Sequence, residues 1–153
     1  LKFKTRWVHL GFIPNEVIEE YKAVLKQSSV VVETEFLGDL ANHDVLEFYK
    51  NNHIDVFINV SSVEGLSVAL MEACSYGITL LATDINGTAE IVNENSGYLL
   101  PLNFEISDAV TILNNIHSDS RYQKRDEARK MFLERFDSNK NFTQFIQNIK
   151  AIN

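Results

Sequence analysis

The fold is decided by the stretch from residue 54 to residue 82, which reads IDVFINVSSVEGLSVALMEACSYGITLLA. It opens with the nearly continuous apolar run Ile54–Val60, as expected of a strand that is covered on both faces. A polar loop and a helical pattern over about Ser67–Tyr76 follow, and Gly77 stands where a helix commonly ends. Ile78–Ala82 is a second apolar run. The order strand, helix, strand predicts a parallel βαβ unit.

The same alternation continues on both sides of this stretch. Strands are predicted at about 6–10, 30–36 and 98–100, helices at about 17–25, 42–49 and 88–93, and the last third of the chain is predicted to be wholly helical. Asn42 is a plausible N-cap for the second of these helices. We therefore predict an α/β fold, with a Rossmann-like parallel sheet, helices on both faces and a helical C-terminal tail. Residues 1–153 are expected to form a single domain.

Composition excludes several classes of partner. The 14 Lys and Arg against 21 Asp and Glu make the net charge −7. A net acidic chain without a Lys/Arg cluster is a poor match for nucleic acid or for an anionic membrane. Cys74 is the single cysteine, so no intrachain disulfide forms and a reducing compartment fits. We therefore predict a cytoplasmic protein that binds no nucleic acid.

Four glycines, Gly11, Gly38, Gly65 and Gly87, follow predicted strands. In open α/β sheets, ligands bind in the crevice beyond the carboxyl ends of the strands. A backbone that approaches a ligand closely favours residues without a Cβ atom. Ordinary turn chemistry is the alternative explanation for each glycine alone.

The residues that suggest chemistry surround the start of the helix after Ile54–Val60. Free backbone N–H groups near Ser67 and Val68 would form an anion site, which the helix dipole strengthens. Glu64 lies just before this helix and Glu72 lies in its second turn. Carboxylates can accept hydrogen bonds from adjacent sugar hydroxyls. A solvated loop position for Glu64 and a surface helix position for Glu72 are the alternatives.

Glu64–Val68, Glu72–Gly77 and Leu81–Asp84 together resemble the signature of family 4 (group 1) retaining glycosyltransferases. The resemblance extends, in the order of that family, to His9–Gly11, Phe36–Gly38, Asp55–Ser61, Gly87–Val92 and Gly97–Leu100. The chain is most similar to bacterial polysaccharide-biosynthesis enzymes. This resemblance implies the C-terminal half of a GT-B glycosyltransferase, which binds the nucleotide-diphosphate sugar.

The resemblance also implies roles for individual residues. Glu64 would contact the transferred sugar as the catalytic residue, Glu72 would bind the ribose, and the helix start Gly65–Val68, which includes Leu66 and Ser67, would hold the diphosphate and sugar. The loop from Leu37 and Gly38 to Asn42 would contact the base. Gly11 and Ser62 complete the predicted donor-binding set. The reaction would retain anomeric configuration, as in a hexosyltransferase, and would need no cofactor or bound metal.

The sequence begins at Leu1 and reaches its first predicted strand within a few residues. We therefore expect a fragment that lacks the first strand of the domain and the N-terminal acceptor domain. The missing domain would bind a glycan or lipid-linked acceptor, and any association with the inner face of a membrane would depend on it. Alone, the fragment is expected to be inactive and to self-associate through uncovered strand edges.

Two other functions stay open at this point. One is a non-catalytic, flavodoxin-like binding module, for which Asp39 and Asp84 would supply acidic groups at strand ends. The other is a nucleotide-binding oxidoreductase domain, although no G-x-G-x-x-G motif follows a predicted strand. Fold alone does not decide among them. The sequence does not identify the sugar, the base or the acceptor.

Overall fold

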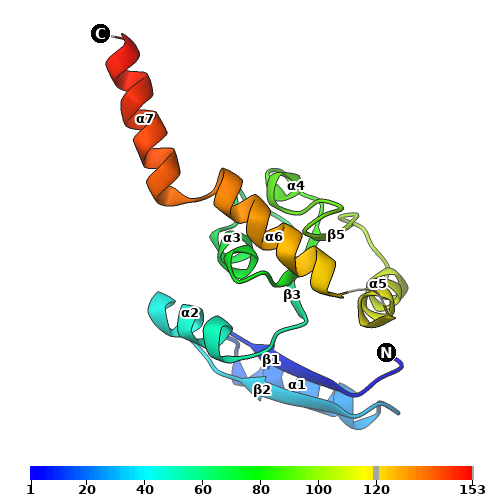
Figure 1. The fold of residues 1–153 in the computed structure, drawn as a ribbon. Helices are drawn as coiled ribbons and strands as arrows, with labels where there is room; N and C mark the ends of the chain where they lie inside the picture. Colours follow the sequence, from blue (N-terminus) through cyan, green and yellow to red (C-terminus); the bar gives the residue numbers. More distant parts are fainter. Residues whose placement is uncertain (119–120, 153) are drawn as a thin grey trace. The chain divides into compact units, whose positions relative to one another are not determined.

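The computed structural model describes residues 1–118 and 121–152, and its elements follow the predicted order (Figure 1). The strands are β1 (Thr5–His9), β2 (Val32–Phe36), β3 (Val56–Asn59), β4 (Thr79–Thr83) and β5 (Gly97–Leu100). The helices are α1 (Asn15–Lys26), α2 (Asn42–Asn51), α3 (Val68–Ser75), α4 (Thr88–Ile91), α5 (Ile106–Ser118), α6 (Arg121–Arg135) and α7 (Ser138–Ile152). The chain divides into two compact units, unit 1 (Leu1–Asn52) and unit 2 (His53–Asn153).

Unit 1 contains β1, α1, β2 and α2. Its two strands pair in parallel, with Thr5 opposite Val32 and His9 opposite Phe36. Just beyond the strand ends, the Gly11 N–H donates a hydrogen bond to the Gly38 carbonyl oxygen at 2.9 Å. Gly11 has φ 116° and Gly38 has φ 67°, a region that favours glycine. The two predicted glycine loops of this unit therefore meet at one edge of its sheet.

The predicted N-cap role of Asn42 is wrong. Ala41 occupies the N-cap position, because its backbone is still extended with ψ 150° and its carbonyl oxygen accepts from Asp44 N–H. Asn42 is the first residue of α2 and is exposed. The helix therefore begins one residue earlier than a side-chain cap at Asn42 would require.

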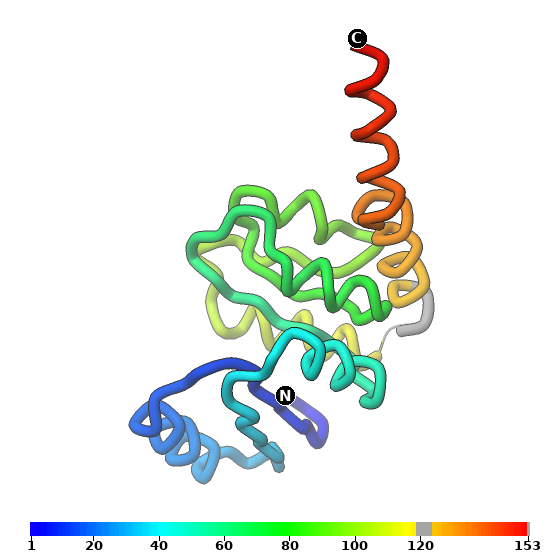
Figure 2. Tube along the Cα trace, turned by 90° about the vertical axis from the view of Figure 1, so that its left-hand side faces the viewer, coloured from blue at the N-terminus to red at the C-terminus, as the bar shows by residue number. Residues whose placement is uncertain are grey.

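Unit 2 is built on a parallel sheet in the order β3-β4-β5. Every residue of the central strand β4 is buried. Helices α3 and α6 pack against β4 and against each other, and α5 packs against β5 (Figures 1 and 2). The most deeply buried large side chains of the chain belong to this unit: Leu70, Ile78, Leu80, Leu81, Ile91, Val92 and Leu100. The parallel α/β class and the helical C-terminal region are as predicted.

Helix α6 is tied to the rest of unit 2 by basic side chains that donate to backbone carbonyl oxygens. Arg125 donates to the carbonyl of Ile54, just before β3. Arg129 reaches the carbonyl of Ser75 at the end of α3, at 2.6 Å. Lys124 and Arg135 make equivalent bonds to the carbonyls of Glu94 and Glu90. We call these four side chains the α6 clamp.

The α6 clamp corrects the expectation that the chain carries no cluster of Lys and Arg. The cluster exists, because helical spacing along α6 gathers basic residues that the overall charge of −7 conceals. Their charged ends are bonded to main-chain oxygens of the same unit. The cluster therefore has a structural use within unit 2.

Helix α7 ends the chain and extends away from the rest of unit 2 (Figures 1 and 2). The helical spacing of Phe142, Phe145, Ile146 and Ile149 in the sequence predicts a packing face on this helix. That face is exposed over the residues the structure describes, since Phe142 is 67% and Ile149 is 45% accessible.

Candidate functional site

The candidate site is the loop that joins β3 to α3. Strand β3 ends at Asn59, and its amide organises the loop that follows. Asn59 Nδ2 donates to Glu64 Oε1 at 3.0 Å and to Ser67 Oγ at 3.3 Å. Asn59 Oδ1 accepts from the backbone N–H of Ser61 at 3.1 Å. A polar side chain at the end of an apolar strand thus reaches the predicted sugar-binding residue and the start of the helix.

The carboxylate of Glu64 is half-buried and receives hydrogen bonds from uncharged donors. Ser61 Oγ lies 2.6 Å from Glu64 Oε1 and 2.7 Å from Asn59 Oδ1. One hydroxyl proton serves one acceptor at a time, and the charged carboxylate is the stronger of the two. The hydrogen bonds of Ser61, then Asn59, then Ser67 hold the pKa of Glu64 below its usual value, against the opposing effect of burial. At neutral pH this side chain is an ionised hydrogen-bond acceptor.

The backbone of the same loop is held by the last residue of β4 and by the loop that follows β4. The Thr83 hydroxyl donates to the Ser61 carbonyl oxygen, and Asn86 Nδ2 donates to the Glu64 carbonyl oxygen at 2.7 Å. A Cβ atom on Gly87 would come within 3.2 Å of the Gly65 carbonyl oxygen. The predicted glycine loops of unit 2 therefore lie together beyond the carboxyl ends of β3 and β4.

The start of α3 is open to an anion. Ser67 is the N-cap residue, but its hydroxyl makes no cap hydrogen bond. The hydroxyl oxygen accepts from the Asn59 amide instead. The first N–H groups of a helix have no partner within the helix, and the first turn of α3 carries no acidic residue to compete for them. Val68 is exposed at this end. The local field favours negative charge.

The predicted donor-binding residues fall into both units. Glu64, Ser67 and the exposed loop residues Ser62, Gly65 and Leu66 belong to unit 2 and surround the start of α3. Glu72 is half-buried in the second turn of α3, and its assignment to a ribose stays a prediction. Four others lie in unit 1, namely Gly11, Leu37, Gly38 and Asn42. Leu37 donates its N–H to the His9 carbonyl oxygen, which continues the pairing of β1 with β2.

Sequence reasoning missed Asn59, Ser61, Thr83 and Asn86 as parts of the site. A signal existed for Asn59, because it is the one polar residue in the apolar run 56–60. A buried amide inside a strand needs partners, and the partners had to come from the next loop. Asn86 also carried a signal, since Asn tolerates the positive φ of 36° observed there.

Basic side chains are absent from the sequence that builds this site. The chain has no Lys or Arg between Lys50 and Arg121. In unit 2 the next basic residues are those of α6, of which the α6 clamp is bonded to carbonyl oxygens. An anion at the start of α3 would therefore meet backbone N–H groups, and any cation would have to come from elsewhere in the protein.

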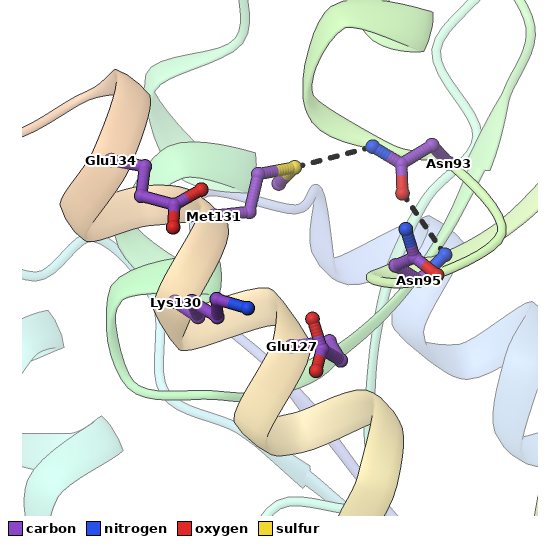
Figure 3. A pocket seen from close by; sticks show the side chains of 6 residues that line it. All are labelled: Asn93, Asn95, Glu127, Lys130, Met131 and Glu134. Atoms are coloured by element: carbon purple, nitrogen blue, oxygen red, sulfur yellow. Dashed lines mark hydrogen bonds between the residues drawn. The ribbon is translucent and has the colours of Figure 1, made fainter.

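A hollow of about 260 Å³ lies in unit 2, between α6 and the loop after α4 (Figure 3). Its lining residues are Asn93, Asn95, Glu127, Lys130, Met131 and Glu134. Asn93 Nδ2 is bonded to Met131 Sδ at 3.2 Å across one wall. None of these residues belongs to the loop that carries Glu64. The predicted site residues are therefore not in this hollow.

Two kinds of feature are absent from the part of the chain that the structure describes. Over 1–118 and 121–152, no three His, Cys, Asp or Glu side chains are placed to hold a metal ion. No helix within the same ranges is long and apolar enough to cross a membrane.

The sequence matches a protein family over most of its length. Residues 15–131 fit the family described as "Glycosyl transferases group 1". The chain belongs to this family. The O-antigen biosynthesis glycosyltransferase WbnH of Escherichia coli is 32% identical over 77 residues, which are 50% of this chain and 21% of WbnH. The resemblance found in the sequence is thus confirmed, and neither alternative family is the one that matches.

Solved structures share the fold, and one of them is described as a domain of a group 1 glycosyltransferase. HepE from Anabaena, solved with UDP, matches with a TM-score of 0.72 at 19% identity, over 94% of this chain and 40% of HepE. HepE has also been solved with UDP-glucose. The C-terminal domain of LpcC from Francisella tularensis matches with a TM-score of 0.57 at 18% identity, over 90% of this chain and 87% of that domain. The predicted C-terminal half of a GT-B glycosyltransferase is confirmed as the fold. The chain spans well under half the length of WbnH and of HepE.

Proposed function

We propose that this chain is the donor-binding domain of a retaining hexosyltransferase for polysaccharide biosynthesis. The complete protein would transfer a sugar from a nucleotide-diphosphate sugar to a glycan or lipid-linked acceptor. The observation that carries this proposal is an ionised, oriented Glu64 beside the open start of α3 in a group 1 glycosyltransferase domain. The Glu64 carboxylate can accept hydrogen bonds from hydroxyl groups, and the N–H groups at the start of α3 can bind phosphate. A nucleotide-diphosphate sugar carries both hydroxyl and phosphate groups.

The transferred sugar is assigned to Glu64. Asn59 and Ser61 both bond its Oε1, and the second oxygen, Oε2, receives neither bond. An acceptor-only carboxylate takes hydrogen bonds from sugar hydroxyls without needing to change its protonation. Because the loop is tied to the end of β4 through Thr83 and to the β4–α4 loop through Asn86, the carboxylate is positioned before the donor arrives.

The diphosphate is assigned to the start of α3. Departure of the sugar leaves negative charge on the nucleoside diphosphate, and helix N–H groups stabilise such charge without reorganisation. Backbone from Gly65 to Val68 would make these contacts. No bound metal is needed in this scheme, although basic side chains from elsewhere in the complete protein would be expected to assist, since residues 51–120 supply none.

The nucleoside is assigned to Glu72 and to loops of unit 1. Glu72 would accept from the ribose hydroxyls. Leu37, Gly38 and Asn42 would contact the base, with Gly11 beside them through its bond to Gly38. HepE binds UDP and UDP-glucose, which makes uridine nucleotides the first probes to use. Transfer would take place in the cytoplasm or at the inner face of its membrane.

The proposal is tested by calorimetry with UDP, GDP, NAD and inorganic phosphate. We expect UDP or GDP to bind more tightly than phosphate or NAD. In the complete protein, Glu64→Gln should lower turnover with the accepted nucleotide sugar far more than it lowers the affinity for free nucleotide, because Glu64 is assigned to the sugar. Glu105→Gln, at an exposed position before α5, is the matched control and should change neither.

Three results would contradict the proposal. Equal affinity for nucleotides and phosphate would remove the nucleoside assignment. Unchanged turnover of Glu64→Gln would remove Glu64 from the sugar site. Tighter binding of NAD than of either diphosphate would instead favour the oxidoreductase alternative.

A further inference from the structure

Asn59 forms hydrogen bonds with three other residues of the candidate site, namely Ser61, Glu64 and Ser67. Its Nδ2 has two protons, and the structure directs one to Glu64 Oε1 and the other to Ser67 Oγ. Its Oδ1 accepts from Ser61 N–H. One side chain at the end of β3 therefore reaches the loop backbone, the predicted sugar-binding carboxylate and the N-cap of α3.

The orientation of this amide follows from the chemistry of its neighbours. The backbone N–H of Ser61 can only donate, so the atom that faces it must be Oδ1. The other end of the amide must then be Nδ2, and it faces Glu64, whose ionised carboxylate can only accept. Both contacts require the same orientation of the amide, so the usual uncertainty over which atom of an Asn side chain is oxygen and which is nitrogen does not arise here.

We propose that Asn59 is a positioning residue for donor transfer, which holds the Glu64 carboxylate in place and joins it to the start of α3. This inference rests on the proposed function of Glu64. Asn59 acts through Glu64 and Ser67, so it need not touch the donor. The amide sets the separation between the group that binds the sugar and the helix start that binds the diphosphate.

Because of the groups that surround Glu64, the titration of its carboxylate reports directly on the hydrogen bond from Asn59 to Glu64. Its pKa is lowered by the uncharged donors Ser61, Asn59 and Ser67, and no charged group contributes to the shift. The titratable side chains of the adjoining elements are Glu72 and Cys74 on α3 and Asp84 on the β4–α4 loop, and none of them is among the causes of this shift. Loss of an Asn59 donor should therefore raise the pKa of Glu64.

The test is a carboxyl-carbon NMR titration of Glu64 in the whole chain, with its signal assigned from Glu64→Gln. Asn59→Asp keeps the shape and the Oδ1 acceptor but turns an acceptor toward Glu64. Asn59→Leu removes all the polar atoms at similar volume. We expect the pKa of Glu64 to rise in both variants, and more in Asn59→Asp because two carboxylates would repel. Asn115→Leu, at an exposed position on α5, should leave it unchanged.

Kinetics of the complete protein give the second measurement. Loss of a hydrogen bond to a charged group should reduce kcat/KM for the sugar donor by roughly ten- to a hundredfold, mainly through kcat. The affinity for free UDP should fall much less. Ser61→Ala, which removes the other donor to Glu64 Oε1, should reproduce both effects. It keeps the test informative if Asn59→Leu fails to fold.

An unchanged Glu64 titration in Asn59→Asp overturns the inference. So does an unchanged kcat/KM in Asn59→Asp when Glu64→Gln has lost activity. A shifted titration together with full activity of Glu64→Gln would reject the proposed function while the Asn59–Glu64 contact stands. The failure of one can therefore be told from the failure of the other.

Discussion

The hydrogen bond from Arg125 of the α6 clamp to Ile54 fastens the chain that leads into β3 and the candidate site, and its contribution to stability can be measured. The Arg125 guanidinium donates to the carbonyl oxygen of Ile54, two residues before β3, and the bond is partly buried. We consider Arg125→Met, which keeps most of the aliphatic stem and removes the donor. The variant leaves the Ile54 carbonyl without this partner, while packing along the stem is largely preserved.

The expected loss in the free energy of unfolding follows from the charge on the donor of this hydrogen bond. A hydrogen bond with a charged partner contributes about 1.5–3 kcal/mol to the free energy of unfolding. For a chain of this size each kcal/mol corresponds to a fall of about 4 °C in Tm, so Tm should drop by roughly 6–12 °C. A carbonyl oxygen does not titrate near neutral pH. The loss should therefore be the same at pH 5 and pH 8 and should depend little on salt.

The assay is urea unfolding followed by far-ultraviolet circular dichroism at both pH values. Lys130→Met, at an exposed position on the same helix, is the control and should change stability by less than about 0.5 kcal/mol. A loss below about 0.5 kcal/mol for Arg125→Met would refute the argument. A loss that disappeared in acid would show that the partner of Arg125 is a carboxylate.

Three further predictions concern single residues. The Cys74 thiol is buried and donates to the Ala128 carbonyl oxygen at 3.0 Å, and burial raises its pKa to about 11. It should therefore resist thiol reagents at pH 8 until urea unfolds the chain, and rapid labelling of the native protein would contradict its burial. Gly97→Ala should lose at least about 2 kcal/mol of stability in a thermal melt, since the new Cβ atom would lie 2.8 Å from the Cβ atom of Leu80. Gly65→Ala is the control: a Cβ atom at position 65 would meet no atom within 4 Å, so this variant should be as stable as wild type. Glu72→Ala should weaken nucleotide binding by about 1–3 kcal/mol in calorimetry, and equal affinity would remove Glu72 from the ribose site.

The order of elements could be predicted because hydrophobic periodicity is a local property. The run Ile54–Val60 predicts β3, which the structure bounds at Val56–Asn59. Gly77 was expected to end α3, and it follows the helix with φ 66°. The position of the start of α2 was missed by one residue, since a cap depends on backbone angles that composition does not reveal. Patterns therefore predict the elements better than their ends.

The hydrogen bonds of the candidate site were beyond sequence reasoning for a different reason. Parallel topology predicts that the loops after β3 and β4 share an edge, and they do. It does not say which donor turns to which acceptor. Asn86 donates to the Glu64 carbonyl from 22 residues away, and the Ser67 hydroxyl oxygen accepts from Asn59 and not from an N–H of its own helix. Such choices depend on the relative placement of side chains from separate elements.

The uneven distribution of buried side chains has a consequence for amide hydrogen exchange. Within the described residues 1–52, Tyr49 is the one buried hydrophobic side chain, while β4 of unit 2 is buried throughout. Segments with few buried contacts open locally at low free-energy cost, and core strands exchange only when the whole unit unfolds. Amides of β1 and β2 should therefore exchange in a faster regime than those of β4. A nucleotide that contacts the Gly11 and Gly38 loops would slow exchange there most, so the protection it confers would report its footprint on unit 1, the more labile of the two units.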